Sequence, residues 1–221
     1  MHRAPMNFPT LLASGLARAL VLTCAGGLAA CGSATPAAVA PDAPATASQS
    51  ASQSLVGHWT GACSPMGATQ GSTVTFDISD TTWAIDFDVF GDLACTAKFA
   101  TVHIEGPYAL GAASSVAAGA HEGKFGFSKK TITPHVDAAA QFLSGASGCA
   151  LPGFAVGVPL DISVTGCAAM GQRPIAACDA DYDLAYVEGD RLTFGARPAD
   201  NDLCTPAKRP VALSKSSFMR R

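Results

Sequence analysis

The sequence predicts an all-β domain of antiparallel strands with one short helix, preceded by an export signal and a disordered linker. From Leu55 onward the apolar residues come in short runs that alternate with polar ones, and Gly, Asp, Ser and Pro break the runs. Alternation of this kind buries one face of a strand and leaves the other in water. The helix is predicted because apolar residues recur at helical spacing in one place, between residues 133 and 145.

The chain opens with an export signal that ends in a bacterial lipobox. An apolar run over residues 19–28 follows Arg3 and Arg18, and it has about the length of a secretory signal core and is too short to span a bilayer. Leu28-Ala29-Ala30-Cys31 then resembles the lipoprotein signals of Gram-negative bacteria. Residues 1–30 are therefore predicted to be a lipoprotein signal peptide, with Cys31 as the acylated first residue of the mature chain. The alternative, an ordinary secretory peptide cut near Ala30, leaves Cys31 unexplained.

Acylation of Cys31 predicts a lasting anchor in a membrane. Each buried methylene contributes about 0.8 kcal/mol, and lipoproteins of this type carry three acyl chains. Gly32 stands where an Asp would favour the inner membrane, so we expect the outer membrane, with the protein facing the periplasm. Residues 31–54 consist almost wholly of Ala, Pro, Ser, Thr and Gln, which predicts a lipidated, disordered tether between the membrane and the domain of residues 55–221.

The charge balance argues against nucleic acid as a partner. The chain has 14 Lys and Arg against 17 Asp and Glu, a formal net charge of −3, and loss of Arg3 and Arg18 with the signal makes it more negative. Positive charge is concentrated at the end, in Lys208, Arg209, Lys215, Arg220 and Arg221. We interpret this basic tail as a solvated, frayed terminus; the alternative is attraction to anionic lipid headgroups.

The expected strands follow one another at short intervals. They cover residues 55–60, 72–78, 82–89, 95–104, 108–110, 124–127, 155–164, 182–187 and 191–195. The clearest is 82–89, where Trp83, Ile85, Phe87 and Val89 alternate with polar or small residues. The last two strands are expected to form a hairpin around Glu188-Gly189-Asp190.

One helix is expected between the sixth and seventh of these strands. Thr133 provides a cap, Pro134 suits the first turn, and Gly145 ends the helix. Its apolar residues are Val136, Ala139, Ala140 and Leu143. The helix is too short and too weakly amphipathic to be a membrane element, so we expect it to plug one end of a barrel or to cover a sheet edge.

No catalytic residue, cofactor or metal site is predicted. Ser147, the serine nearest to a glycine-rich turn, lacks the Gly-x-Ser-x-Gly spacing of a hydrolase nucleophile. The histidines that follow the signal segment show no metal-binding spacing and are expected to be surface residues or hydrogen-bonded strand residues: His58, His103, His121 and His135.

Two acidic sets invite a test for calcium. They are Asp86, Asp88 and Asp92, and Asp179, Asp181, Asp183 and Asp190. The second set resembles an EF-hand loop, but Leu184 occupies the position that must be glycine and Asp190 replaces the usual glutamate. We therefore expect both sets to be alternating acids that face solvent.

Six cysteines are left once Cys24 leaves with the signal and Cys31 is acylated. They are Cys63, Cys95, Cys149, Cys167, Cys178 and Cys204. An even set in an exported protein predicts disulfides, and six cysteines allow fifteen pairings. Zinc is the weaker interpretation, because no Cys-x-x-Cys pair is present.

Several separated stretches resemble the adenomatosis-polyposis-coli-down-regulated domain family, which occurs in vertebrate Wnt inhibitors and in bacterial lipoproteins. The matching stretches are Gly57-His58-Trp59 with Cys63, residues 90–95, residues 133–139 with Cys149, residues 157–162, residues 166–171, Asp181-Tyr182-Asp183-Leu184, residues 194–200 and Arg209-Pro210. Two departures are Phe90 or Gly91 where an aromatic is usual, and Phe154 where the family carries tryptophan.

The resemblance implies a lipocalin-like antiparallel barrel, open at one end, whose apolar interior accepts a lipid or acyl chain. The Wnt-related role of the vertebrate members does not carry over to bacteria, whereas the pocket does. The expected disulfides are Cys63–Cys95, Cys149–Cys167 and Cys178–Cys204; the last pair follows from the resemblance, because the vertebrate domains lack both cysteines, and short loop closure favours the second.

The expected ligand-binding residues are the aromatic side chains that alternation places on inward faces. We expect the cavity wall to include residues from the set Trp59, Trp83, Phe87, Phe99, Phe125 and Phe127; the alternative is a filled core. The leading functional interpretation is therefore a membrane-anchored lipoprotein with a disulfide-braced barrel that binds a lipid, a fatty-acyl chain or another apolar ligand. A periplasmic interaction or inhibitor module with an unknown protein partner is the alternative, and an esterase-like enzyme is a weaker one.

Overall fold

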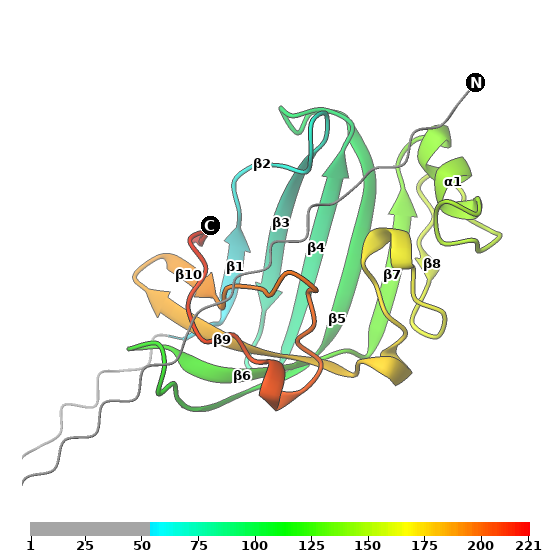
Figure 1. Cartoon of the computed structure of the whole chain (residues 1–221). Helices are drawn as coiled ribbons and strands as arrows, with labels where there is room; N and C mark the ends of the chain where they lie inside the picture. Colours follow the sequence, from blue (N-terminus) through cyan, green and yellow to red (C-terminus); the bar gives the residue numbers. More distant parts are fainter. Residues whose placement is uncertain (1–53) are drawn as a thin grey trace, which may run out of the picture. The chain divides into compact units, whose positions relative to one another are not determined.

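The structure is a computed structural model that describes residues 54–221. The expected signal peptide, the lipidation site Cys31 and most of the tether lie outside the described residues. The strands are β1 (Gly57–Thr60), β2 (Ser64–Pro65), β3 (Gly71–Ile78), β4 (Thr82–Phe90), β5 (Lys98–Ala113), β6 (His121–Gly126), β7 (Lys129–Pro134), β8 (Leu160–Asp161), β9 (Ala180–Glu188), β10 (Arg191–Phe194) and β11 (Phe218–Arg220), and the one α-helix is α1 (Asp137–Ser144). The expected all-β class with a single short helix is confirmed (Figure 1).

Eight strands close into an antiparallel barrel. The ring runs β1-β3-β4-β5-β6-β9-β10-β11 and returns to β1 through the pairs Trp59–Arg220 and Thr60–Met219. β2 is added beside β3, β7 is added beside β5, and β8 pairs with β7. Closure leaves the ring itself without an unpaired edge, which is the usual way in which an antiparallel sheet avoids edge-to-edge aggregation.

The barrel wall divides where β6 passes into β7. Both strands follow the same edge of β5: β6 pairs with residues 108–113 and β7 with residues 100–105. On their other edges β6 pairs with β9, whereas β7 pairs with β8. The chain therefore bends between Gly126 and Lys129, so that β6 and β7 share β5 as one partner but have different second partners.

Glycine allows the close packing at this bend. A Cβ atom on Gly106 would lie 2.1 Å from the carbonyl oxygen of Gly126, which no real side chain tolerates. Gly106 stands opposite Trp83 on β4. Because Gly106 has no side chain, the indole of Trp83 reaches across β5 and its Nε1 donates a hydrogen bond to the Gly126 carbonyl at 2.9 Å.

The helix begins later than the sequence predicts. Thr133 and Pro134 do not start it; they belong to β7 and lie opposite Thr101 and Ala100 of β5. Strand pairing wins here because β7 carries β-branched residues that fill a sheet position better than a helix turn. α1 instead starts at Asp137 and buries Ala139 and Leu143. No helix within residues 54–221 is long and apolar enough to cross a membrane.

Two other expected elements differ in length. The strand expected over residues 155–164 is reduced to Leu160–Asp161, because Gly153 and Gly157 adopt positive φ angles and turn the chain. Conversely, the two strands expected at 95–104 and 108–110 are one strand, β5, which continues through Pro107. The missing N–H of Pro107 costs little, since β5 changes partner from β7 to β6 at that point.

The basic tail is part of the barrel, so the expectation of a frayed terminus is wrong. Phe218–Arg220 forms β11 and pairs with both β1 and β10. Lys208 lies 3.5 Å from Asp200, and Arg209 lies 2.8 Å from Glu122. These cations pair with acids of the same domain, which holds the segment against it.

One region of the barrel interior is filled by Trp59 and Arg220. Trp59 is fully buried, and its Nε1 donates to the carbonyl of Leu55 at 2.8 Å. The guanidinium of Arg220 lies 4.1 Å from the Trp59 ring centroid and donates to the carbonyl of Val56 at 2.5 Å. This cation–π contact fills the interior where β1 and β11 meet.

The three disulfides join the expected pairs. They are Cys63–Cys95, Cys149–Cys167 and Cys178–Cys204. The first ties the segment after β1 to the β4–β5 connection, and the second ties the segment after α1 to the one after β8. The third joins the segment just before β9 to the segment that follows β10, and both of its cysteines line the central cavity.

Candidate functional site

The main candidate site is a cavity of about 500 Å³ inside the barrel. Strands β3, β4, β5, β6, β7, β9, β10 and β11 contribute to its wall, together with residues 170–173 and the segment after β10. Strand alternation explains the inward set, because residues two apart on a strand point to the same face. Val74 and Phe76 on β3 and Ile85 on β4 follow this rule.

The wall is mainly aromatic on one side. Its aromatic members are Phe76, Trp83, Phe87, Phe125, Phe127, Phe194 and Phe218. Several contact one another at distances typical of aromatic packing: 4.8 Å between the ring centroids of Phe76 and Phe218, and 5.4 Å between those of Trp83 and Phe125. Six of the seven rings, all except Phe87, are thus linked by ring contacts into one apolar surface.

Four of the six aromatic residues expected at the site line the cavity. They are Trp83, Phe87, Phe125 and Phe127. Trp59 does not, because Arg220 and the backbone of Leu55 cover its ring. Phe99 does not line the cavity either. It is out of phase with Ile104, which lines the cavity, so it lies on the other face of β5. There its ring centroid is 6.3 Å from that of Phe142 of α1.

The other side of the cavity is polar and lies where the barrel wall divides. Lys130 of β7 and Asp181 and Asp183 of β9 face the cavity, as do Arg173 and Arg197 from the connecting segments. Alternation analysis missed all five. Lys130 carried a usable signal, because it is in phase with the buried Ile132 two residues later and is therefore an inward lysine.

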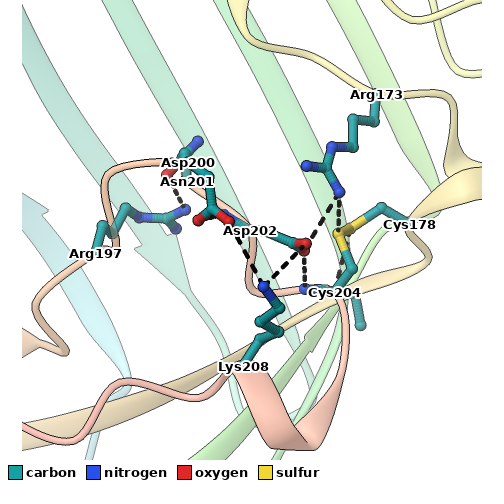
Figure 2. A network of polar contacts seen from close by, with 9 residues as sticks. Arg173, Cys178, Arg197, Asp200, Asn201, Asp202, Cys204 and Lys208 are labelled. Atoms are coloured by element: carbon teal, nitrogen blue, oxygen red, sulfur yellow. Dashed lines mark hydrogen bonds and ion pairs between the residues drawn. A yellow bond between two sulfur atoms is a disulfide. The ribbon is translucent and has the colours of Figure 1, made fainter. Parts of the chain in front are cut away.

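Ion pairs and a disulfide join the two segments around the polar side. Arg173 Nη1 lies 3.3 Å from Asp202 Oδ1, and Cys178 is bonded to Cys204. Figure 2 shows these contacts with those of Lys208, which lies 3.8 Å from Asp202. The segment after β8 and the segment after β10 are thus cross-linked beside the cavity.

Asp183 corrects the expectation that the acids of its set face solvent. Only 2% of Asp183 is exposed. Its Oδ1 accepts hydrogen bonds from the backbone N–H groups of Leu184 at 2.7 Å and Gly195 at 2.9 Å. Burial raises the pKa of Asp183 to about 6, although the positive charge of Arg197 and the two N–H donors act in the opposite direction.

Asp181 has a direct cationic partner. Its Oδ2 lies 2.7 Å from Arg197 Nη2, and the same guanidinium donates to Asn201 at 3.0 Å. The two acids of β9 therefore differ: Asp181 is neutralised by an ion pair, whereas Asp183 is held by backbone donors alone. A site with mixed charge at one side and apolar walls elsewhere suits a ligand with one polar end.

The four histidines within residues 54–221 lie outside the cavity and have hydrogen-bond partners. His58 Nδ1 is 2.6 Å from Asp77, and His103 Nδ1 is 2.6 Å from Asp86. His135 contacts the hydroxyl group of Thr101, and His121 contacts the backbone carbonyl of Gly111. Within residues 54–221, no group of three or more His, Cys, Asp or Glu side chains is placed to hold a metal ion.

Comparisons with known proteins give no further assignment. No protein-family model matches the chain, and none of the curated proteins matches it.

Proposed function

We propose that this protein is an outer-membrane lipoprotein whose barrel binds a lipid or another apolar ligand in its central cavity. The cavity carries the ligand proposal. Packed protein interiors have few voids larger than a water molecule. The cavity of this barrel, by contrast, has a volume of about 500 Å³, which falls within the range of about 300–1,000 Å³ that is typical of ligand pockets. Eight-stranded barrels of this kind hold one small ligand in lipocalins. The proposed role is binding rather than catalysis.

We also propose membership of the adenomatosis-polyposis-coli-down-regulated domain family. Two of the matching stretches, residues 181–184 and residues 194–200, contact each other beside the cavity. Asp183 of the first accepts a hydrogen bond from the N–H of Gly195 in the second, and Asp181 pairs with Arg197. Such contacts give a physical reason for these residues to occur together, and they support the proposal that the stretches form one motif.

Binding is expected to follow chain length. The domain of residues 54–221 contains every strand of the barrel and all three disulfides, so it is a suitable test protein once circular dichroism shows β structure and cooperative melting. In calorimetric titrations with fatty acids, each added methylene should tighten binding about fourfold until the cavity is full, because burial contributes about 0.8 kcal/mol per methylene.

A pair of neighbouring substitutions locates the binding site. Val74→Trp places an indole in the cavity and should weaken binding of the longest chains at least about tenfold. Thr73 is the preceding residue and lies opposite Asp88 on the outer face, so Thr73→Trp is the matched control and should leave binding unchanged. No binding by the folded domain, or equal effects of the two substitutions, would contradict the proposed site and favour an interaction module.

The anchor rests on the sequence and has its own test. Cys31→Ala should abolish acylation and leave the protein either unprocessed or released from the outer membrane into the periplasm, because three acyl chains hold a protein far more strongly than a tether whose one charged residue is Asp42. Fractionation followed by a salt wash measures the distribution, and Ser33→Ala, two residues away in the tether, is the control. Persistence of Cys31→Ala in the salt-washed outer membrane would show that another element holds the protein there.

A further inference from the structure

Lys130 is the most unusual charged residue of the cavity. Only 3% of it is exposed, yet it lines the same space as the aromatic wall. β7 places it there, because Lys130 lies opposite Ile104 in the β5–β7 pair and thus on the inward face. Its ammonium group lies 4.1 Å from the centroid of Phe127.

The ammonium group of Lys130 has only part of the partners that a buried cation needs. Nζ donates one hydrogen bond, to the backbone carbonyl of Arg173 at 3.2 Å, and an ammonium has three N–H donors. Among the described residues, no carboxylate forms an ion pair with it. The cavity acid Asp181 is held instead by Arg197 at 2.7 Å.

Burial without an ion pair is costly for a charged group. Desolvation lowers the pKa of Lys130, with Asp181 opposing this effect and Arg173 adding to it. An anionic group placed beside Nζ would accept hydrogen bonds from the two remaining N–H groups and offset the free-energy cost of burying the ammonium. Since Phe127 adjoins the ammonium, the rest of such a ligand would continue along the aromatic wall.

We propose that the cavity selects single-chain amphiphiles with an anionic head group, which binds Lys130 while the alkyl chain lies along the aromatic wall. The proposal rests on the function proposed above and narrows it to a class of ligand. Carboxylates and monoalkyl phosphates share the required chemistry. A cationic head group would instead meet the buried positive charge and be rejected.

Five dodecyl compounds test the head group at constant chain length. Dodecanoate, dodecyl phosphate, dodecanol, methyl dodecanoate and dodecyltrimethylammonium are titrated at pH 8 into the domain of residues 54–221, below their aggregation concentrations. Dodecanoate should bind about 10- to 100-fold more tightly than methyl dodecanoate, because a charge-assisted hydrogen bond is the difference between them. The ratio of dodecanoate to dodecyl phosphate identifies the preferred anion.

Adjacent lysines provide the matched variants. Lys130→Met removes the charge and keeps the approximate length of the side chain. Dodecanoate and methyl dodecanoate should then bind this variant with about equal affinity. Lys129 is the preceding residue and its side chain is exposed, so Lys129→Met should keep the full preference, and Lys130→Arg should retain most of it. Thermal melting checks that each variant is folded.

The possible outcomes separate the two proposals. If wild type binds dodecanoate and methyl dodecanoate equally, or if Lys130→Met keeps the preference, the head-group proposal is overturned while the apolar cavity still binds ligand. If none of the five compounds binds to the folded domain, both proposals fail.

Discussion

Deletion of residues 218–221 is expected to abolish cooperative folding of the domain. β11 lies between β1 and β10, so its loss opens the ring and leaves one edge of each of these two strands unpaired. The deletion also removes Phe218 from the aromatic wall and Arg220 from the ring of Trp59. Truncation of a fully buried Phe side chain costs about 3–5 kcal/mol, and loss of the half-buried Phe218 contributes part of this on top of the lost strand pairs, whereas domain stabilities are about 5–15 kcal/mol in total.

Circular dichroism and thermal melting measure this effect. The deletion variant should lose its sharp transition and bind a hydrophobic dye, as expected for an open apolar interior. Lys215→Ala removes a charge from the same segment without removing a strand residue, and it should change the free energy of unfolding by no more than about 0.5 kcal/mol. A deletion variant that melts like the wild type would mean that β11 does not hold the barrel closed.

Replacement of Asp183 by Asn is expected to change how stability depends on pH. Burial raises the pKa of Asp183 to about 6 in the folded protein, whereas an unfolded aspartate has a pKa of about 3.9. The folded state therefore holds the proton more tightly, so its contribution to stability is full below about pH 4 and is lost as pH rises through about 6. The difference between the two pKa values is equivalent to about 3 kcal/mol.

Asn keeps an oxygen acceptor for the N–H groups of Leu184 and Gly195 and carries no charge at any pH. Asp183→Asn should thus match the wild type near pH 4 and exceed its free energy of unfolding by up to about 3 kcal/mol at pH 8. Urea denaturation at the two pH values measures the difference. The control is Asp179→Asn, at an exposed carboxylate 3.8 Å from Lys124, and it should have little effect at either pH. Equal stabilities of Asp183→Asn and wild type at pH 8 would contradict the buried, proton-binding state of Asp183.

Local sequence patterns predicted the strands that are paired through short connections. β3 and β4, and likewise β9 and β10, form hairpins whose alternation and turn residues lie within one window of sequence. The inward aromatic residues of β4 and β6 followed from the same alternation. Phe99 is out of phase with Ile104, which lines the cavity, and Phe99 itself does not line it.

Features that depend on distant partners were not predictable in this way. β11 has only three residues, and its pairing with β1 and β10 is invisible in the sequence around it. Thr133 resembles a helix cap until β5 is placed beside it. Asp183 resembles the other alternating acids, and only the contact with Gly195 shows that its carboxyl group is buried.

Closure of the ring between β1 and β11 has a consequence for the time order of folding. The hydrogen bond from Arg220 to Val56 joins residues 164 positions apart. A chain that leaves the ribosome or a secretion channel N-terminus first presents β1 and its partner β3 early, but the other edge of β1 has no partner until residues 218–220 emerge. During that interval an exposed strand edge is open to pairing with other chains. The barrel is therefore completed only after its last strand has emerged, and we expect the nascent chain to need protection from aggregation until then.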